Sequence, residues 1–466
     1  MPPPEYPTPP TANVVDRYHG QRVADAYRPL EDTDAPATRA WIEAQNSLTE
    51  RCLAEVAQRA QLRERVGALW DHPRRGVPWR RGDRWFQRRN SGLQDQDVLW
   101  TMEAPDAEGR AAIDPNLLSV EGTVALVATS ASDDGGLLAY ATSAQGSDWM
   151  TWRVRDVMAR EDLDDLVEWS KFSSAAWLAG GGAFYYAAYD PPPREGTYEA
   201  QNKNQRVYLH RLGTPQEEDE VVYERPDQPE WGFDPHVTQD GRYLVLHVWE
   251  GTQPWNRVHY LDLEKNGGVE ALLDEGDARY ELAGTEGPVW YYLTDLDAPR
   301  GRLIAVDVRH PERQYWREVV PESEETLERA LLVGGRLFGL YLHHARHRLL
   351  LFETDGGLVR EVNLPDLGTV EQLAGRETDD VLHLTFLTFT RPPAVLRCDV
   401  ATGEVEEVSP PGLDVGKGMV TEQVFVDSPD GTKVPMFLVH REDVTPTGDV
   451  PALLWGYGGF NAAVTP

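Results

Sequence analysis

The chain has 466 residues, 41% hydrophobic and 26% charged, so it is long enough for two domains or for a large repeat domain with a second piece. Its 77 acidic side chains outnumber 45 basic ones, and the formal net charge of −32 argues against nucleic-acid binding through phosphate neutralisation. The sequence contains no apolar run long enough for a membrane span and no basic, apolar leader, and its two cysteines lie far apart. We therefore expect a cytoplasmic protein without a disulfide framework.

Residues 1–71 are predicted to form a helical N-terminal arm. After a proline-rich lead, Asp34 is a candidate N-cap, and Pro36 falls in the first turn, where its missing N–H costs nothing. An apolar stripe then recurs near the helical period, at Trp41, Leu48, Cys52 and Val56. A second helix is expected over about residues 61–70, ending before a His-Pro pair.

Residues 72–415 repeat a unit of roughly 48 residues. In each unit a polar turn is followed by a short aromatic or aliphatic strand. Seven such turns begin near Gly82, Asp134, Gly180, Asp240, Glu286, Gly334 and Thr378. Short strands separated by turn signals and grouped in fours at this period predict a seven-bladed β-propeller. A pair of β-sandwiches would explain the turns but not the sevenfold register.

Residues 416–466 follow a different pattern. Two strands within residues 420–440 are joined by a Ser-Pro-Asp-Gly hairpin turn, and Val450–Trp455 is a continuous apolar run typical of a strand covered on both faces. A Gly-Tyr-Gly-Gly-Phe turn comes next, at residues 456–460. Hairpin, buried strand and glycine-rich turn are typical of the start of an α/β-hydrolase domain, in which such a turn aims N–H groups at a developing oxyanion. The predicted fold is therefore mainly β: a seven-bladed propeller, a helical arm, and the first strands of an incomplete, truncated α/β-hydrolase domain.

Several stretches carry a resemblance to a known family. They include YHGQRVADAYRPLED (18–32), GLQDQDVLW (92–100), KFSSAAW (171–177), SPDGTKVPMFLVH (428–440) and GYGGFN (456–461). By the order and spacing of these stretches, the chain resembles the N-terminal two-thirds of the prolyl oligopeptidases, cytosolic serine peptidases that cleave after proline in short peptides. The resemblance implies a seven-bladed propeller that gates access to an α/β-hydrolase domain, which is built from the N-terminal arm and the C-terminal part of the chain.

The resemblance also implies three site residues. Tyr457 would donate its hydroxyl to the oxyanion, while Phe460 and Phe172 would line the pocket for the substrate proline. Two further pocket positions of the family appear here as Gly232 and Thr252, which leaves the detailed specificity open. The alternative for all three aromatic residues is a purely structural role in a turn or a propeller core.

The chain contains no Gly-x-Ser-x-Gly motif, and the family's Ser, Asp and His would lie beyond Pro466. We therefore expect the chain to lack the catalytic triad and to be inactive alone, with a missing C-terminal hydrolase half as a partner. Two interpretations stay open. The chain is either the N-terminal portion of a prolyl oligopeptidase-like endopeptidase acting on short proline-containing peptides, or a stand-alone propeller that serves as a binding or scaffold protein after gene truncation.

Neither a cofactor nor a metal is expected. His343, His344 and His347 cluster after a predicted strand, and three imidazoles could bind zinc. Strand alternation, however, directs the first two to opposite faces, and no nearby carboxylate completes a ligand set. The acidic runs fall at predicted turns and are interpreted as solvated surface.

Overall fold

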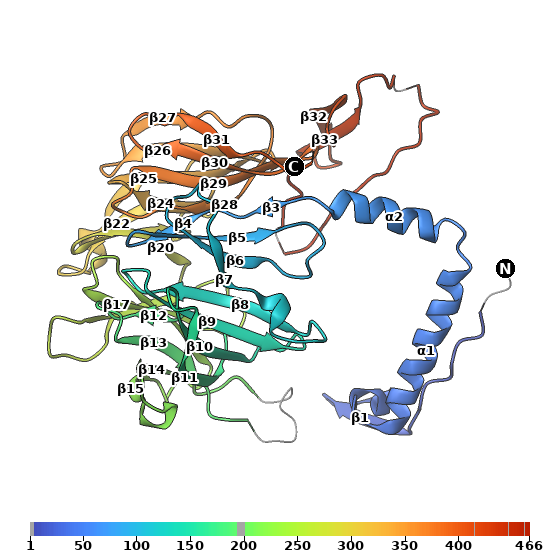
Figure 1. Ribbon diagram of the computed structural model, residues 1–466, viewed down its shortest axis with the longest axis horizontal. Helices are drawn as coiled ribbons and strands as arrows, with labels where there is room; N and C mark the ends of the chain where they lie inside the picture. The colour runs from blue at the N-terminus through green and yellow to red at the C-terminus, as the bar shows by residue number, and fades with distance from the viewer. Residues whose placement is uncertain (1–3, 193–200, 414, 446, 461) are drawn as a thin grey trace. The chain divides into compact units, whose positions relative to one another are not determined.

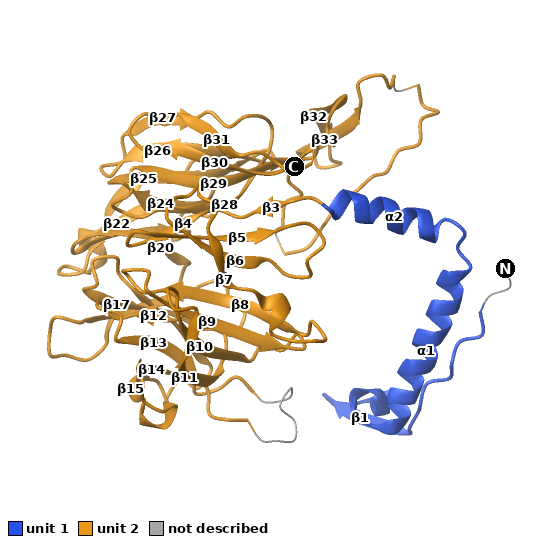
Figure 2. Cartoon of the chain, in the orientation of Figure 1, with its two compact units in different colours: residues 1–71 blue, residues 72–466 orange. Residues whose placement is uncertain are grey.

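The computed structural model describes residues 4–192, 201–413, 415–445, 447–460 and 462–466 (Figure 1). It divides into two compact units, residues 1–71 and residues 72–466, which Figure 2 colours separately. Asn461, the last residue of the GYGGFN stretch, lies outside the described residues. None of the described helices is long and apolar enough to cross a membrane.

The first unit combines a β-hairpin with two helices. Its elements are β1 (Val14–Tyr18), β2 (Gln21–Asp25), the 3₁₀ helix η1 (Arg28–Glu31), α1 (Pro36–Ala54) and α2 (Arg59–Trp70). The predicted N-cap at Asp34 is wrong, because α1 begins after Ala35 and neither residue's side chain caps it. Instead, Oδ1 of Asp32 accepts hydrogen bonds from the backbone N–H groups of Asp34 and Ala35, both at 3.0 Å. The hairpin was not predicted from the sequence.

The second unit is built almost entirely of antiparallel strands. The first sheet contains β3 (Arg74–Arg75), β4 (Trp79–Arg81), β5 (Arg84–Asn90), β6 (Val98–Met102) and β7 (Arg110–Ile113), followed by η2 (Pro115–Leu117). An eight-stranded sheet follows: β8 (Val124–Ala131), β9 (Leu137–Ala144), β10 (Met150–Asp156), β11 (Glu161–Ser170), β12 (Ala176–Trp177), β13 (Ala183–Ala188), β14 (Arg206–Arg211) and β15 (Glu220–Glu224), with η3 (Gln216–Glu218) before its last strand.

Four four-stranded sheets and a hairpin complete the unit. The first of these sheets contains β16 (Trp231–Val237), β17 (Tyr243–Glu250), β18 (Arg257–Asp262) and β19 (Glu270–Leu273), and the second contains β20 (Tyr280–Glu286), β21 (Val289–Thr294), β22 (Arg302–Asp307) and β23 (Arg317–Val320), with η4 (Arg313–Tyr315) before its last strand. The third contains β24 (Thr326–Val333), β25 (Arg336–His343), β26 (Arg346–Glu353) and β27 (Leu358–Val362). The fourth contains β28 (Thr369–Ala374), β29 (Val381–Thr388), β30 (Arg391–Asp399) and β31 (Val405–Ser409). The hairpin is β32 (Met419–Asp427) and β33 (Lys433–Arg441).

The prediction of seven separate blades is wrong. In the described residues, five separate four- or five-stranded sheets form blades, and one continuous eight-stranded sheet spans β8 to β15. The two halves of this sheet are joined by pairing of Ser170 at the end of β11 with Ala188 at the end of β13. A separate blade made of β12 to β15 would need β12 as its first strand, but β12 has only two residues. The mainly β character of the propeller region holds, but its division into seven equal blades does not.

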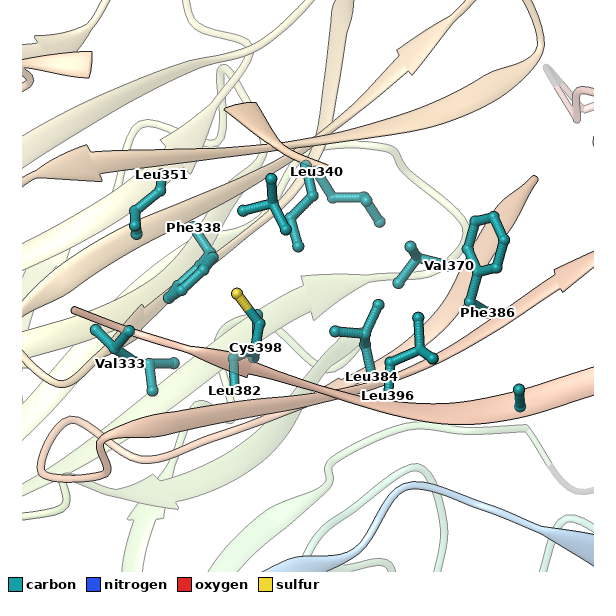
Figure 3. Packing of buried hydrophobic residues seen from close by; sticks show 14 residues of the cluster. Val333, Phe338, Leu340, Leu351, Val370, Leu382, Leu384, Phe386, Leu396 and Cys398 are labelled. Carbon is teal, nitrogen blue, oxygen red and sulfur yellow. The ribbon is translucent and has the colours of Figure 1, made fainter. Parts of the chain in front are cut away.

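Neighbouring sheets pack face to face through apolar side chains. Figure 3 shows the core between the sheets β24–β27 and β28–β31, where Phe338 and Leu340 meet Leu384 and Leu396 and all four are at most 1% exposed. Cys398 also lies in this core, and burial raises the pKa of its thiol to about 12. Strand alternation explains the pattern, because successive side chains of each strand point to opposite faces and so reach the two adjacent cores.

The first and last of these sheets meet through side-chain contacts. The Val77 N–H donates to Oε1 of Gln372 at 3.0 Å, and the ring of Trp85 lies edge-on to His383 with centroids 5.3 Å apart. Among the described strands, none pairs a member of β3–β7 with a member of β28–β31. The ring of sheets is therefore closed by packing and isolated hydrogen bonds, without a shared strand.

The hairpin β32–β33 forms at the predicted position. Asp427 pairs with Lys433 at its end, and the turn is closed by a 2.9 Å hydrogen bond from the Ser428 N–H to the Thr432 carbonyl. The predicted buried strand at residues 450–455 is wrong, because this segment forms no strand and Leu453 is 91% exposed. An apolar run becomes a strand only where a neighbouring strand satisfies its backbone groups, and the described residues provide none here.

Candidate functional site

Phe172 lies in the turn that joins β11 to β12. Its φ of 53° is in the left-handed region, which is uncommon for a bulky side chain, and Trp169 three residues earlier has a φ of 62°. Phe172 is 47% exposed, and its ring meets the Trp249 ring edge-on, with centroids 5.8 Å apart. The surrounding structure therefore keeps the backbone of Phe172 in an unfavourable conformation while its ring stays half exposed. Local strain of this kind is typical of functional sites.

The residues on both sides of Phe172 are firmly anchored. The Lys171 carbonyl accepts from Nε2 of Gln205 at 2.8 Å, and the Lys171 ammonium lies 4.0 Å from the centre of the Trp149 ring. Burial lowers the pKa of this lysine. On the other side, the Ser174 N–H donates to Oδ1 of Asp234 at 2.6 Å. These bonds fix the turn, so the side chain of Phe172 is presented in a defined position.

Phe172 and Trp249 line a cavity of about 850 Å³. Its other lining residues are Gln201, Asn202, Lys203, Glu230, Asp234, His247, Gly251 and Thr252. Gly232 pairs with Trp249 across β16 and β17, and a Cβ at position 232 would overlap the indole ring. The glycine therefore makes room for Trp249, which forms the wall. Of the two further pocket positions inferred from the sequence, Thr252 lines this cavity.

Three polar side chains of the cavity, those of Lys203, Glu230 and His247, have partners that fix their roles. Nζ of Lys203 lies 3.8 Å from Oε1 of Glu230. The Asn256 amide is oriented by Tyr280, whose N–H donates to Oδ1 at 2.7 Å and whose carbonyl accepts from Nδ2 at 3.0 Å. Nδ2 of Asn256 then faces Nδ1 of His247 at 3.2 Å, so this ring nitrogen accepts. Burial lowers the pKa of His247, which is therefore neutral and carries its proton on Nε2.

The structure does not bring the three predicted site residues together. Tyr457 is 56% exposed and Phe460 is 97% exposed, and both lie after β33, where the described residues form no helix or strand. Neither of them lines the cavity to which Phe172 contributes. The oxyanion role of Tyr457 and the proline-pocket role of Phe460 stay predictions. The sequence analysis missed Trp249, His247 and Asp234. The only signal for His247 and Trp249 was their position just after the strand predicted behind Asp240, and Asp234 had none.

Two of the three clustered histidines, His343 and His347, have carboxylate partners that the sequence did not suggest. Nδ1 of His343 lies 2.6 Å from Oε1 of Glu325, and Nε2 of His347 lies 2.9 Å from Oε2 of Glu328. Nδ1 of His347 also accepts from the Val370 N–H at 2.9 Å. In the part of the chain that the structure describes, no group of three or more His, Cys, Asp or Glu side chains is arranged to hold a metal ion.

Most of the chain matches the model of a known protein family. A family model described as "Prolyl oligopeptidase, N-terminal beta-propeller domain" matches residues 6–411. The chain belongs to the prolyl oligopeptidase family. The matched residues include all the sheets from β3 to β31 and every residue that lines the Phe172 cavity.

Named relatives agree with this assignment. The chain is 32% identical over 465 residues to the prolyl endopeptidase of Elizabethkingia meningoseptica, and the alignment covers 99% of this chain and 65% of that protein. It is 29% identical to prolyl oligopeptidase A of Amanita bisporigera, covering 99% of the chain and 66% of that protein. The chain thus spans about 65% of the length of the curated relatives.

Solved structures show the same relationship. One, from a study of two prolyl endopeptidases and their inter-domain dynamics, is 38% identical with a TM-score of 0.76, and the alignment covers 99% of this chain and 67% of that one. Prolyl oligopeptidase B of Galerina marginata, solved with a 25mer macrocyclization substrate, is 26% identical with a TM-score of 0.85, over 94% of this chain and 66% of that one.

Proposed function

We propose that the chain is the peptide-binding propeller portion of a prolyl oligopeptidase-type serine endopeptidase, which cleaves after proline in short peptides. The observation that carries the proposal is the cavity of about 850 Å³ walled by Phe172 and Trp249, with Phe172 held in a left-handed turn. Its size suits a segment of several peptide residues, and its two aromatic walls offer an apolar surface for a side chain of that segment. Support also comes from the Galerina marginata relative, which was solved with a peptide substrate.

In this proposal the propeller binds and orients the substrate. Phe172 and Trp249 pack against an apolar part of the peptide, and the Nε2–H of neutral His247 donates to a peptide carbonyl. Tyr457 would donate to the oxyanion of the acyl-transfer step, and Phe460 would contact the substrate proline. The nucleophile, base and orienting acid are supplied by residues outside these 466, since the chain has no Gly-x-Ser-x-Gly motif.

Two properties of the whole enzyme are part of the same proposal. The propeller limits access to short peptides, and the protein acts in the cytoplasm. Cys52 is exposed and Cys398 is buried, and both are free thiols, which fits a reducing compartment.

A binding measurement with the chain alone tests the first part. Calorimetric titration with acetyl-Ala-Gly-Pro-amide should give saturable binding, and Phe172→Ala should weaken it about tenfold, because the aromatic wall is lost. Tyr315→Ala is the matched control, since Tyr315 is also an exposed aromatic residue and lies outside the cavity. Equal affinity in the wild type and the Phe172 variant would contradict the assignment of the cavity.

Catalysis is tested by adding the C-terminal segment of a relative. The chain alone should not hydrolyse a Gly-Pro amide, whereas a fusion of residues 1–466 to the part of the Elizabethkingia meningoseptica enzyme that follows the aligned region should cleave after proline. Turnover by the chain alone at the rate of an intact relative would show that the triad argument is wrong. A folded but inactive fusion that still binds the peptide would favour the scaffold interpretation.

A further inference from the structure

One carboxylate of the Phe172 cavity lacks a cationic partner. The other lining acid, Glu230, is paired with Lys203 at 3.8 Å. Among the residues that the structure describes, no Lys, Arg or His nitrogen lies within ion-pair distance of Asp234. Oδ1 of Asp234 accepts from the Ser174 N–H at 2.6 Å, a bond that fixes the carboxylate beside the turn carrying Phe172. Asp234 thus brings one uncompensated negative charge into a partly enclosed aromatic cavity.

The cationic side chains near the cavity are committed elsewhere. The Lys171 ammonium lies over the Trp149 ring at 4.0 Å and donates to Oδ1 of Asn202 at 3.2 Å. His247 cannot serve as the counter-charge, because Nδ2 of Asn256 donates to its Nδ1 and leaves no room for a second ring proton. The charge of Asp234 favours protonation of His247, but burial dominates and keeps the pKa of that ring below its usual value.

The two aromatic walls of the cavity lie beside the Asp234 carboxylate. The rings of Phe172 and Trp249 stand at 85° to each other, so they present two different surfaces to the same cavity. Aromatic faces attract ammonium and guanidinium groups, and a nearby carboxylate adds a directed ionic partner. An aliphatic stem would pack on the rings while its charged end reached Asp234.

We propose that Asp234, Phe172 and Trp249 form a subsite for a positively charged group of the bound peptide. The group is the side chain of lysine or arginine, or the N-terminal ammonium. This inference rests on the proposed peptide-binding function and adds to it a preference for basic peptides. A basic side chain and an N-terminal ammonium would bind these three residues through the same contacts. The test therefore includes peptides that distinguish the two sources of charge.

The test compares charged and neutral peptides on the 466-residue chain. Three acetylated peptides each carry one lysine, at one of the three positions before proline in acetyl-Ala-Ala-Ala-Pro-amide, and three others carry norleucine there, which keeps the aliphatic stem without the charge. A seventh peptide has a free N-terminus in place of the acetyl group. Calorimetric titration should show about fivefold to tenfold tighter binding of one lysine peptide than of its norleucine partner, or the same gain for the free amine.

The Asp234→Asn variant identifies the residue responsible. Its side-chain oxygen still accepts from the Ser174 N–H, so the turn is kept and only the charge is lost. In this variant the lysine peptide should bind about as tightly as its norleucine partner. The norleucine peptides should bind the variant with the same affinity as they bind the wild type. Glu218→Gln, which removes an exposed acid outside the cavity, should leave the preference unchanged.

The outcomes separate this inference from the function on which it rests. If neither lysine nor the free N-terminus tightens binding, and binding of the peptides is lost in Phe172→Ala, the cation subsite is overturned and the peptide cavity is left standing. A lysine preference that persists in Asp234→Asn would also overturn it. Absence of binding by every peptide would overturn the proposed function and this inference together.

Discussion

The buried histidine of the eight-stranded sheet gives a sharp prediction for the pH dependence of stability. His210 on β14 is fully buried, with Nε2 3.0 Å from Oδ1 of Asp165 and Nδ1 2.9 Å from Oδ1 of Asp219. Both carboxylates already accept other bonds, from the Gly213 N–H and the Tyr186 hydroxyl, both at 2.7 Å. Because two acceptors face the ring, both ring nitrogens must carry protons. Burial opposes this charge, but the bonds to Asp219 and Asp165 outweigh it and raise the pKa of His210.

We expect His210→Gln to destabilise the propeller by about 3–5 kcal/mol at pH 6, because it leaves two buried carboxylates without their cation. The pKa is raised in the folded state, so the contribution of His210 is fully present below the unfolded value of about 6.5 and is lost as the pH rises through the folded value. The loss proceeds at up to about 1.4 kcal/mol per pH unit. The difference between wild type and variant in urea unfolding, followed by circular dichroism at pH 6 to 9, should therefore shrink with rising pH.

His259 on β18 is a matched control with the opposite sign. Its Nε2 lies 2.8 Å from Oδ1 of Asp274, but its Nδ1 accepts from the Tyr223 hydroxyl at 2.8 Å, so the ring is neutral. Burial lowers the pKa of His259 despite the Asp274 bond. The contribution of His259 is present above about pH 6.5 and is lost as the pH falls.

If the His210→Gln effect stays constant from pH 6 to 9, or falls below about 1 kcal/mol at pH 6, the assignment of a buried imidazolium is refuted.

Two further predictions concern packing and surface. Gly232→Ala should displace the Trp249 indole, cost about 1–3 kcal/mol in urea unfolding and abolish measurable peptide binding, whereas Gly182→Ala, where an added Cβ meets nothing within 4 Å, should change neither. Normal peptide affinity in the Gly232 variant would contradict the role of the glycine. Because Leu453 and Leu454 are 91% and 87% exposed, we expect the chain to self-associate, and replacing both by aspartate should lower its apparent mass in light scattering. An unchanged apparent mass would show that this segment does not drive association.

The strands of the propeller were predictable because their signal is local. The polar turn predicted at Asp240 lies between β16 and β17, and the following apolar run forms a strand from Tyr243 to Glu250. The union of two expected blades was not predictable, because it depends on one long-range pair, Ser170 with Ala188. Turn signals place strand ends along the chain, but they do not say with which strand an end will pair.

The candidate site was predictable only in part, for a related reason. Phe172 was found through a short motif shared with a family, and the structure places it in a cavity. Trp249 and Asp234 reach that cavity from two strands of the next sheet, and no local pattern marks them. The opposite error occurred at residues 450–455, where apolarity predicted a strand although strand formation also requires a partner that the described residues do not offer.

The joined sheet also sets how the propeller opens. Strand pairing connects β8 to β15, with the single pair of Ser170 and Ala188 joining the two halves, whereas each of the five separate sheets has a ladder of its own. Amide protons exchange when a cooperative unit opens, and such units follow continuous hydrogen-bonded structure. The described strands of this sheet therefore form the largest set of paired strands in the propeller, and the Phe172 turn lies at the junction of its two halves. An opening of this junction would unpair Ser170 and release the turn that holds Phe172, so the position of the half-exposed Phe172 ring depends on the one pair that joins the two halves of the sheet.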